Sequence, residues 1–346
     1  MRRAAALLLL VAALAPAASE PRPRSHQQRA IDWLWSQQES DGGWHSKTYG
    51  LLRSGQSLTP FVLLTLLEKD AVAAKSGDVD RALQFIREHL AEDGSLGRVD
   101  AYSQDYPNYA TALAVRAIVR AQRPGWREQI APMVGYLRLQ QFAEENGWNR
   151  EDAAYGAWGM GGERLRPPGT GHVDLSMTRH VLEALRDAEV DREDPLWAKV
   201  RVYLARLQNE DGGFFFSTTE EDTNKAGGHR SYGTATADGI LALLASGVDR
   251  EDPRVRRATA WLLSNHRRGD RIPGFVGPAY ERWHRGLAFY YAAALSDTQA
   301  QGFTVQAPAP QRRDGSYVNP EPLVKEDDPL IATVFRVRAG QYLRER

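Results

Sequence analysis

Apolar residues recur at helical spacing along most of the chain, in paired segments separated by glycine-rich turns. The first segment of each pair is amphipathic, whereas the second is apolar over most of its length. Apolar positions three and four residues apart are typical of α-helices that pack against a core. The pattern therefore predicts an all-α protein built from helical hairpins.

The turns between paired helices repeat a short motif. It is Asp-Gly-Gly-Trp at residues 41–44 and Asp-Gly-Gly-Phe at residues 211–214, with shorter versions at residues 92–96, 144–148 and 314–317. Glycine provides the positive φ angle that the end of a helix needs, and the aromatic side chain can fold back onto the hairpin. Turn geometry alone accounts for these residues.

Both sets of helices can be placed from this repeat. First helices are expected at residues 30–38, 82–90, 133–141 and 200–208, and Asp-Pro pairs at residues 194–195 and 252–253 predict helix starts. Second helices are expected at residues 57–67, 108–120, 174–185, 232–245, 281–295 and 327–342. Repeated hairpins bury their apolar faces as an open solenoid or as a closed ring. The sixth unit is irregular, because residues 299–311 carry prolines and polar residues where a first helix would lie.

The N-terminal residues resemble a targeting segment. Arg2 and Arg3 precede an apolar run at residues 4–15, which is followed by Pro16 and small residues. This order is typical of a secretory signal peptide, and a membrane anchor is the alternative. We assign residues 1–18 to the signal peptide and residues 19–346 to one repeat domain. The expected localisation is the periplasm or the cell exterior, and no transmembrane segment is expected in the mature chain.

Charge and cysteine content exclude several classes of function. The 44 lysines and arginines balance the 44 aspartates and glutamates, so the chain has no basic excess for binding nucleic acid. It contains no cysteine, which excludes disulfides, a cysteine nucleophile and thiolate metal ligands.

The turn motif resembles that of a known superfamily. Residues 37–44 and 207–214 resemble the glutamine–tryptophan motif of the squalene–hopene cyclase and protein prenyltransferase superfamily, and residues 174–178, 232–239 and 326–333 are similar to inner-helix starts of bacterial members. The resemblance covers most of residues 26–345. It implies an (α/α) toroid of five or six hairpins, whose second helices form an inner ring around a central cavity. A full squalene cyclase has two such domains, whereas this length holds one.

The catalytic motifs of the superfamily do not carry over. Squalene–hopene cyclases protonate an alkene with the middle aspartate of an Asp-x-Asp-Asp motif, and the nearest match, residues 78–81, lacks the final aspartate and fits a helix cap. The zinc site of protein prenyltransferases needs a cysteine. The magnesium motif of class I terpene enzymes needs a later aspartate that residues 326–329 lack. An enzyme and a protein without catalysis therefore both remain open.

Any acid for a cavity reaction is expected where the inner helices begin, since partial burial there raises the pKa of a carboxyl group. The candidate catalytic residues are Asp238, Asp174, Asp327 and Asp328. Asp174 and Asp327 also fit as helix N-caps. Asp238 falls inside an apolar helix, where a carboxylate is costly unless it is paired or faces a polar cavity.

Aromatic residues gather in the same regions. The candidate ligand-binding residues are Tyr109, Trp158, Tyr232, Trp283 and Tyr290. Aromatic rings could stabilise a carbocation or hold a polyisoprenoid chain, and core packing is the alternative for each of them. The histidines lack zinc-type spacing, and no phosphate-loop or dinucleotide motif is present, so no metal or cofactor is expected.

Three functions follow from these observations. The first is an exported repeat protein that binds, and in its catalytic version converts, an apolar polyisoprenoid-like ligand in its ring. The second is a non-catalytic scaffold that binds proteins or other envelope components. The third is a carbohydrate-active enzyme, because secreted (α/α) toroids also use paired carboxylates and aromatic platforms on glycans.

Overall fold

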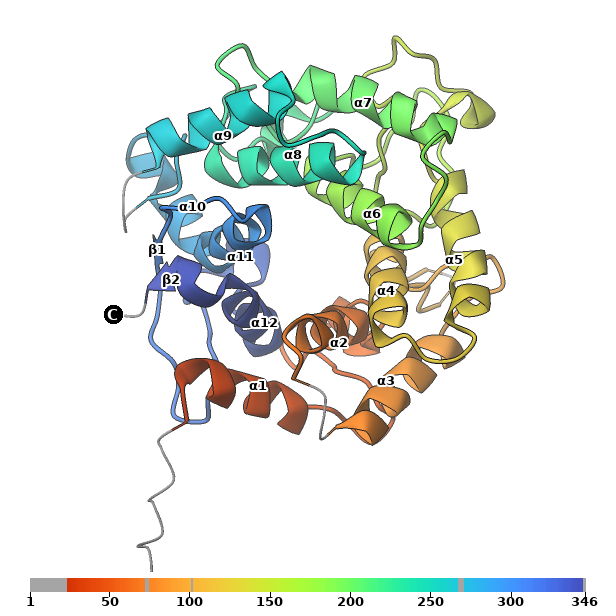
Figure 1. Cartoon of the computed structure of the whole chain (residues 1–346), viewed down its shortest axis with the longest axis vertical. Helices are drawn as coiled ribbons and strands as arrows, with labels where there is room; N and C mark the ends of the chain where they lie inside the picture. Colours follow the sequence, from red (N-terminus) through yellow and green to blue (C-terminus); the bar gives the residue numbers. More distant parts are fainter. Residues whose placement is uncertain (1–23, 72–74, 101, 267–270, 345–346) are drawn as a thin grey trace, which may run out of the picture.

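Helical hairpins arranged in a ring make up the described part of the chain (Figure 1). The structure is a computed structural model that describes residues 24–71, 75–100, 102–266 and 271–344. The expected signal peptide, residues 1–18, lies outside the described residues. The all-α toroid that the family resemblance implied is confirmed.

The ring has an inner and an outer layer. The inner helices are α2 (Leu58–Glu68), α4 (Pro107–Ala121), α6 (Leu175–Asp187), α8 (Gly233–Ala245), α11 (Ala288–Thr298) and α12 (Pro329–Ala339). The outer helices are α1 (His26–Ser36), α3 (Ser76–Glu88), α5 (Trp126–Leu139), α7 (Pro195–Leu207) and α9 (Pro253–Asn265), and a short helix α10 (Glu281–Gly286) precedes α11. The 3-10 helices are η1 (Leu51–Ser54), η2 (Glu144–Asn146), η3 (Glu221–Thr223), η4 (Pro278–Tyr280), η5 (Pro322–Val324) and η6 (Gly340–Tyr342).

Burial explains why the inner helices are so apolar. Each inner helix contacts its two inner neighbours, and α12 contacts α2, so the layer closes on itself (Figure 1). In α2 every residue from Leu58 to Leu67 is buried, whereas α3 buries one face. No helix among the described residues is long and apolar enough to cross a membrane.

The repeated turns connect each hairpin to its neighbours. The backbone N–H of Trp44 donates to the hydroxyl of Thr59 at 3.0 Å, and that of Phe214 donates to Thr236 at 3.0 Å. The turn glycine packs against the next outer helix, because a Cβ on Gly42 would lie 2.5 Å from the carbonyl oxygen of Arg81. The motif therefore holds adjacent units together as well as turning the chain.

The last turn contacts α1 in the same way as the first turn contacts α3. Gln38 Nε2 donates to a carbonyl of α3, that of Asp78, at 2.9 Å. In the sixth unit, Gln311 Nε2 donates to the His26 carbonyl of α1 at 2.9 Å. Residues 299–311 form no helix, as expected, and the parallel strands β1 (Val305–Gln306) and β2 (Leu343–Arg344) pair nearby. The ring is closed by its own repeat motif.

The structure corrects the bounds of several helices. The outer helices α1, α3 and α5 begin four to seven residues before the expected positions, and two of the inner helices also differ. The helix expected at residues 281–295 is broken between α10 and α11, and the carboxyl oxygens of Glu326 accept the backbone N–H groups of Phe289 and Tyr290 at 3.3 and 2.8 Å. The last inner helix begins at Pro329 rather than at Asp327, and its N-cap is Asp328, which accepts the N–H of Leu330 at 2.9 Å. Proline at the first helical position explains the shift, because it places the cap on the residue before it.

Candidate functional site

A cavity of about 460 Å³ opens where the first turns of α4, α6, α8 and α11 meet. Six aromatic side chains line it: Tyr106, Tyr109, Phe216, Tyr232, Tyr290 and Phe335. Aliphatic and methionine residues add apolar surface: Met160, Met177, Leu287, Leu323 and Val324. The polar lining is His172, Asp174, Ser176, Lys225, Thr234, Asp238 and Lys325. A concave, mostly apolar site with a few polar groups is typical of small-molecule binding.

Asp238 is the most buried carboxyl group of this cavity, with 1% of its surface exposed. Its oxygens accept the Tyr290 hydroxyl at 2.7 and 2.9 Å and Arg179 Nη1 at 2.9 Å. Burial raises the pKa of Asp238 to about 6, although the charge of Arg179 lowers it. Asp238 is therefore a carboxyl group that can carry a proton near neutral pH inside an apolar cavity.

Farther along the inner helices, toward their C-terminal ends, charged side chains from all six of them form a charge belt. Its members are Glu68, Arg116, Arg179, Glu183, Asp238, Asp297 and Arg338. The ion pairs run in a closed circuit from Glu68 through Arg116, Glu183, Arg179, Asp297 and Arg338 back to Glu68, at N–O distances of 2.5 to 3.1 Å. Asp238 branches from this circuit at Arg179.

The belt satisfies charges that would otherwise be costly to bury. Arg179 and Glu183 are 2% and 4% exposed. Although burial opposes ionisation, the neighbouring Arg179 and Arg116 keep the pKa of Glu183 well below its usual range. Buried charges persist when they are paired in this way, and removal of one partner is strongly destabilising. The belt joins α6 to α11, which are separated by α8 in the ring.

A second polar group lies at the rim of the cavity. Asp174 caps α6 by accepting the N–H of Met177 at 2.6 Å, and it lies 2.8 Å from His172 Nε2. The other ring nitrogen of His172 contacts Glu220. The hydrogen bond to Asp174 raises the pKa of His172, because the carboxylates favour the imidazolium. Asp174 is thus held by a helix and a histidine, whereas Asp238 is held by an arginine and a tyrosine.

Two known protein families match successive parts of the chain. The family model of the prenyltransferase alpha-alpha toroid domain matches residues 3–152, and that of the squalene-hopene cyclase C-terminal domain matches residues 170–283. Together these matches support a terpenoid cyclase-like family for the chain.

Two curated relatives from this family are bacterial. The chain is 23% identical over 313 residues to a squalene–hopene cyclase of Bradyrhizobium diazoefficiens, with 78% of this chain and 44% of that protein covered. It is 24% identical over 277 residues to a probable squalene–hopene cyclase of Sinorhizobium fredii, with 78% of this chain and 34% of that protein covered. The chain therefore spans less than half the length of these relatives.

Solved structures support the terpenoid cyclase-like fold. The type II terpene cyclase MstE from Scytonema, in complex with geranylgeranyl dihydroxybenzoate, has a TM-score of 0.53 at 14% identity, covering 92% of this chain and 96% of that one. A D-mannose isomerase has a TM-score of 0.52 at 12% identity, covering 80% and 81%. At these low identities, the two matches show a similarity of fold alone.

The cavity of this terpenoid cyclase-like chain brings together five of the nine residues singled out from the sequence. They are Asp174, Asp238, Tyr109, Tyr232 and Tyr290. The other four lie outside its lining. Asp327 accepts the Tyr49 hydroxyl at 2.5 Å, and Asp328 caps α12. Trp158 is fully buried and donates to the Leu137 carbonyl at 2.7 Å, and Trp283 packs against the core.

Sequence reasoning missed three charged residues of the site, Arg179, Lys225 and Lys325. Arg179 lies in the apolar inner helix α6, four residues before Glu183, so its position alone implied a buried carboxylate partner. Lys225 lies in an irregular segment after η3, where no periodicity marks which side chains face inward.

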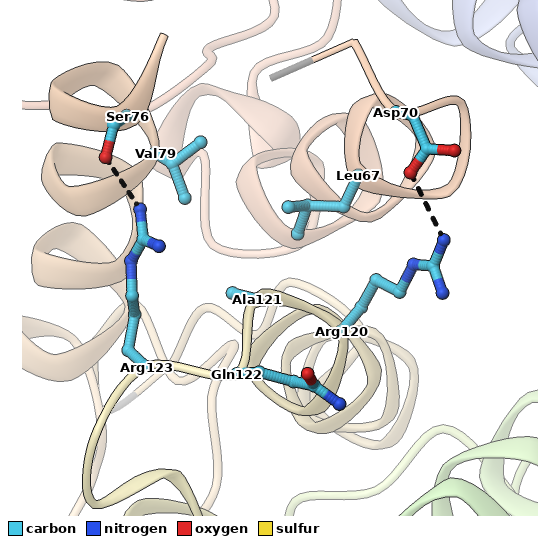
Figure 2. A pocket seen from close by; sticks show the side chains of 8 residues that line it. All are labelled: Leu67, Asp70, Ser76, Val79, Arg120, Ala121, Gln122 and Arg123. Atoms are coloured by element: carbon cyan, nitrogen blue, oxygen red, sulfur yellow. Dashed lines mark hydrogen bonds and ion pairs between the residues drawn. The ribbon is translucent and has the colours of Figure 1, made fainter. Parts of the chain in front are cut away.

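A second pocket, of about 490 Å³, lies between α2, α3 and α4 at the opposite end of the inner helices (Figure 2). Both of its arginines have partners within the pocket, since Arg123 donates to the Ser76 hydroxyl at 3.0 Å and Arg120 pairs with the Asp70 carboxylate at 3.5 Å (Figure 2). It lacks the aromatic lining of the first cavity. Within the described ranges, no cluster of three or more histidine, aspartate or glutamate side chains could hold a metal ion.

Proposed function

We propose that this chain binds an apolar, polyisoprenoid-like ligand in its inner-ring cavity and converts it by protonating an alkene, with Asp238 as the proton donor. The observation that carries the proposal is the position of Asp238, which is 1% exposed in the wall of a cavity lined by six aromatic side chains. Among proteins of this fold, MstE in complex with geranylgeranyl dihydroxybenzoate is described as a type II terpene cyclase. Its ligand is an isoprenoid, which agrees with the chemistry proposed for this cavity.

The proposed step transfers the proton of the Asp238 carboxyl group to one carbon of a bound alkene, which leaves a cation on the other carbon. Arg179 and the Tyr290 hydroxyl stabilise the carboxylate that forms, because both donate to its oxygens. The faces of Tyr109, Tyr232 and Tyr290 provide negative potential for the cation. Loss of a proton from a neighbouring carbon completes an isomerisation or a ring closure without any oxidant.

The proposal is tested first by mass spectrometry of small molecules extracted from natively purified protein. A stoichiometric polyisoprenoid supports the cavity as a lipid site, and a bound sugar would replace the proposal with the carbohydrate-active alternative. Protein that carries nothing and binds no added isoprenoid would favour the scaffold function.

The catalytic part is tested with Asp238→Asn. We expect this variant to retain ligand binding and to lose conversion by a factor of at least about 100, since a positioned acid contributes roughly that much. Asp327→Asn is the matched control, because it removes a carboxylate that lies outside the cavity lining. Undiminished turnover in Asp238→Asn would remove Asp238 as the acid.

A further inference from the structure

Lys225 is a charged side chain of the cavity wall that the proposed acid chemistry does not use. Its Nζ lies 3.4 Å from the centroid of the Phe216 ring and 6.0 Å from that of Trp283. It donates one long hydrogen bond, to the carbonyl of Thr223 at 3.4 Å. In the described part of the chain, no carboxylate oxygen lies within 4.0 Å of this nitrogen.

Two other lysines show how unusual this environment is. Lys199 on α7 pairs with the Glu144 and Glu145 carboxylates at 2.9 Å. Lys325, in the same cavity wall as Lys225, donates to the Tyr106 hydroxyl at 3.1 Å. The Lys325 amine also lies 5.7 and 5.6 Å from the ring centroids of Tyr49 and Tyr106, whereas the Lys225 amine lies 3.4 Å from that of Phe216 and, among the described residues, donates to a backbone carbonyl alone. Burial lowers the pKa of Lys225 to about 8, so roughly a tenth of the amine is neutral and nucleophilic at pH 7.

A hydroxyl group of the same cavity also lacks a partner. The Tyr232 side chain is fully buried, and its hydroxyl has no hydrogen-bond partner. Asp174 and Asp238 lower the stability of a negative charge at this position, which raises the pKa of Tyr232 further above its burial-raised value. The hydroxyl therefore remains a neutral donor that can bind an oxygen atom of a ligand.

We propose that Lys225 forms an imine with an apolar, isoprenoid-like aldehyde bound in the cavity, with Tyr232 as the donor to the aldehyde oxygen. This inference rests on the proposed cavity ligand and specifies the functional group that the ligand carries. An aldehyde fits because its hydrocarbon part suits the aromatic lining, and its carbonyl group meets both an amine without an ion pair and a free hydroxyl.

The reaction is balanced without any further reagent. The Nζ lone pair attacks the carbonyl carbon, a C–N bond forms, and a proton moves from nitrogen to the carbonyl oxygen to give a carbinolamine. Protonation of that hydroxyl by Asp238 lets it leave as water, the C=N bond forms, and the proton remaining on nitrogen returns to the Asp238 carboxylate.

The test uses farnesal as the probe aldehyde and farnesol as the matched alcohol. The purified protein is incubated with farnesal, reduced with borohydride, and examined by intact-mass measurement and peptide mapping. We expect one adduct, equal in mass to the aldehyde less one oxygen atom, on the peptide that contains Lys225. Lys225→Arg keeps the positive charge but cannot form this imine, so it should lose the adduct, whereas Lys199→Arg should retain it.

Binding of farnesol, measured by tryptophan fluorescence, separates this inference from the function on which it rests. If farnesol binds to the wild type and to Lys225→Arg but farnesal leaves no adduct on Lys225, the imine proposal is wrong. The proposal of an isoprenoid-like ligand in the cavity is then still supported. If neither compound binds, both proposals fail. Adducts spread equally over exposed lysines, and unchanged in Lys225→Arg, would also overturn the imine.

Discussion

Asp238 lies where the apolar cavity meets the charge belt, and both surroundings act on its proton. The sequence indicated this residue, because a carboxylate inside an apolar inner helix needs a partner or a cavity. It did not indicate that Arg179 and Tyr290, from two other helices, would be the partners. Such partners depend on the rotation of each helix about its axis. The repeat pattern shows which face of a helix is buried, but not its exact rotation.

The rate of conversion should depend on pH through Asp238. Its protonated form is the proposed acid, and its pKa is raised to about 6, so the rate should be highest below pH 6 and fall as the pH rises through this value. Well above it, we expect a loss of about tenfold per pH unit. A steady-state pH profile checks this, and a rate that rises between pH 6 and 8 would contradict the assignment of Asp238 as an acid.

Arg179 should be among the most sensitive residues for stability. Arg179→Met leaves the carboxylates of Asp238, Glu183 and Asp297 without their shared partner, and we expect a loss of about 3–5 kcal/mol in the free energy of unfolding. Arg123→Met is the control, because Arg123 forms an exposed ion pair with Asp80 that contributes less than about 1 kcal/mol. Urea denaturation of both variants measures these losses. Similar losses in free energy of unfolding would show that the buried ion pairs of the belt stabilise the fold no more than an exposed pair does.

At the scale of helices, the turn motif gave the most reliable predictions. Its glycine, aromatic residue and preceding glutamine have the same roles at residues 38–44, 208–214 and 311–317. In the third unit the expected copy at residues 144–148 is wrong, because Gln141, Gly156 and Trp158 make these contacts instead. The second unit has Leu90 and Leu96 where the others have glutamine and an aromatic residue. The break between α10 and α11 escaped prediction because it depends on Glu326, a residue distant in sequence that caps the first N–H groups of α11. A contact between residues that are distant in sequence produces no periodic pattern from which it could be predicted.

Glu326 should make stability depend on pH. Burial raises the pKa of Glu326 from 4.5 to about 8, so the folded protein holds a proton that the unfolded chain releases. The contribution of this proton to the free energy of unfolding is fully present below pH 4.5 and is lost as the pH rises through 8. The slope is up to about 1.4 kcal/mol per pH unit. Glu326→Gln should flatten the melting temperature between pH 5 and 8. An identical pH dependence in both proteins would show that Glu326 is not the titrating group.

At the scale of the whole molecule, the repeat pattern alone left open whether the hairpins form a solenoid or a ring. The family resemblance implied a toroid, which is confirmed, but not whether five or six hairpins take part. Closure is decided by the contact of the last turn with the first helix, since Gln311 and Gly315 contact α1 as earlier turns contact their next outer helix. The motif at residues 314–317 was visible in the sequence. Its partner on α1 was not.

Gly315 tests this closure. Its φ angle is +99°, and a Cβ would lie 2.5 Å from the Arg29 carbonyl oxygen of α1, so Gly315→Ala should weaken the attachment of α1. Gly302→Ala is a matched control, since Gly302 has a φ angle of +87° but no heavy atom within 4 Å of the added Cβ. We expect the Gly315 variant to lose about 1–3 kcal/mol more than the control, from crowding. Hydrogen exchange should be faster in α1, and unchanged protection there would contradict the closure.

We infer that the charge belt closes the ring on one side of the cavity, because its circuit of ion pairs joins the inner helices and includes Arg179, the partner of Asp238. A ligand would then enter and leave on the side where the inner helices begin. A long ligand can therefore enter with only one end first, and the end that reaches Asp238 is chosen at the rim. Selectivity for one end of a chain molecule would then be a property of the opening, separate from the chemistry at the bottom.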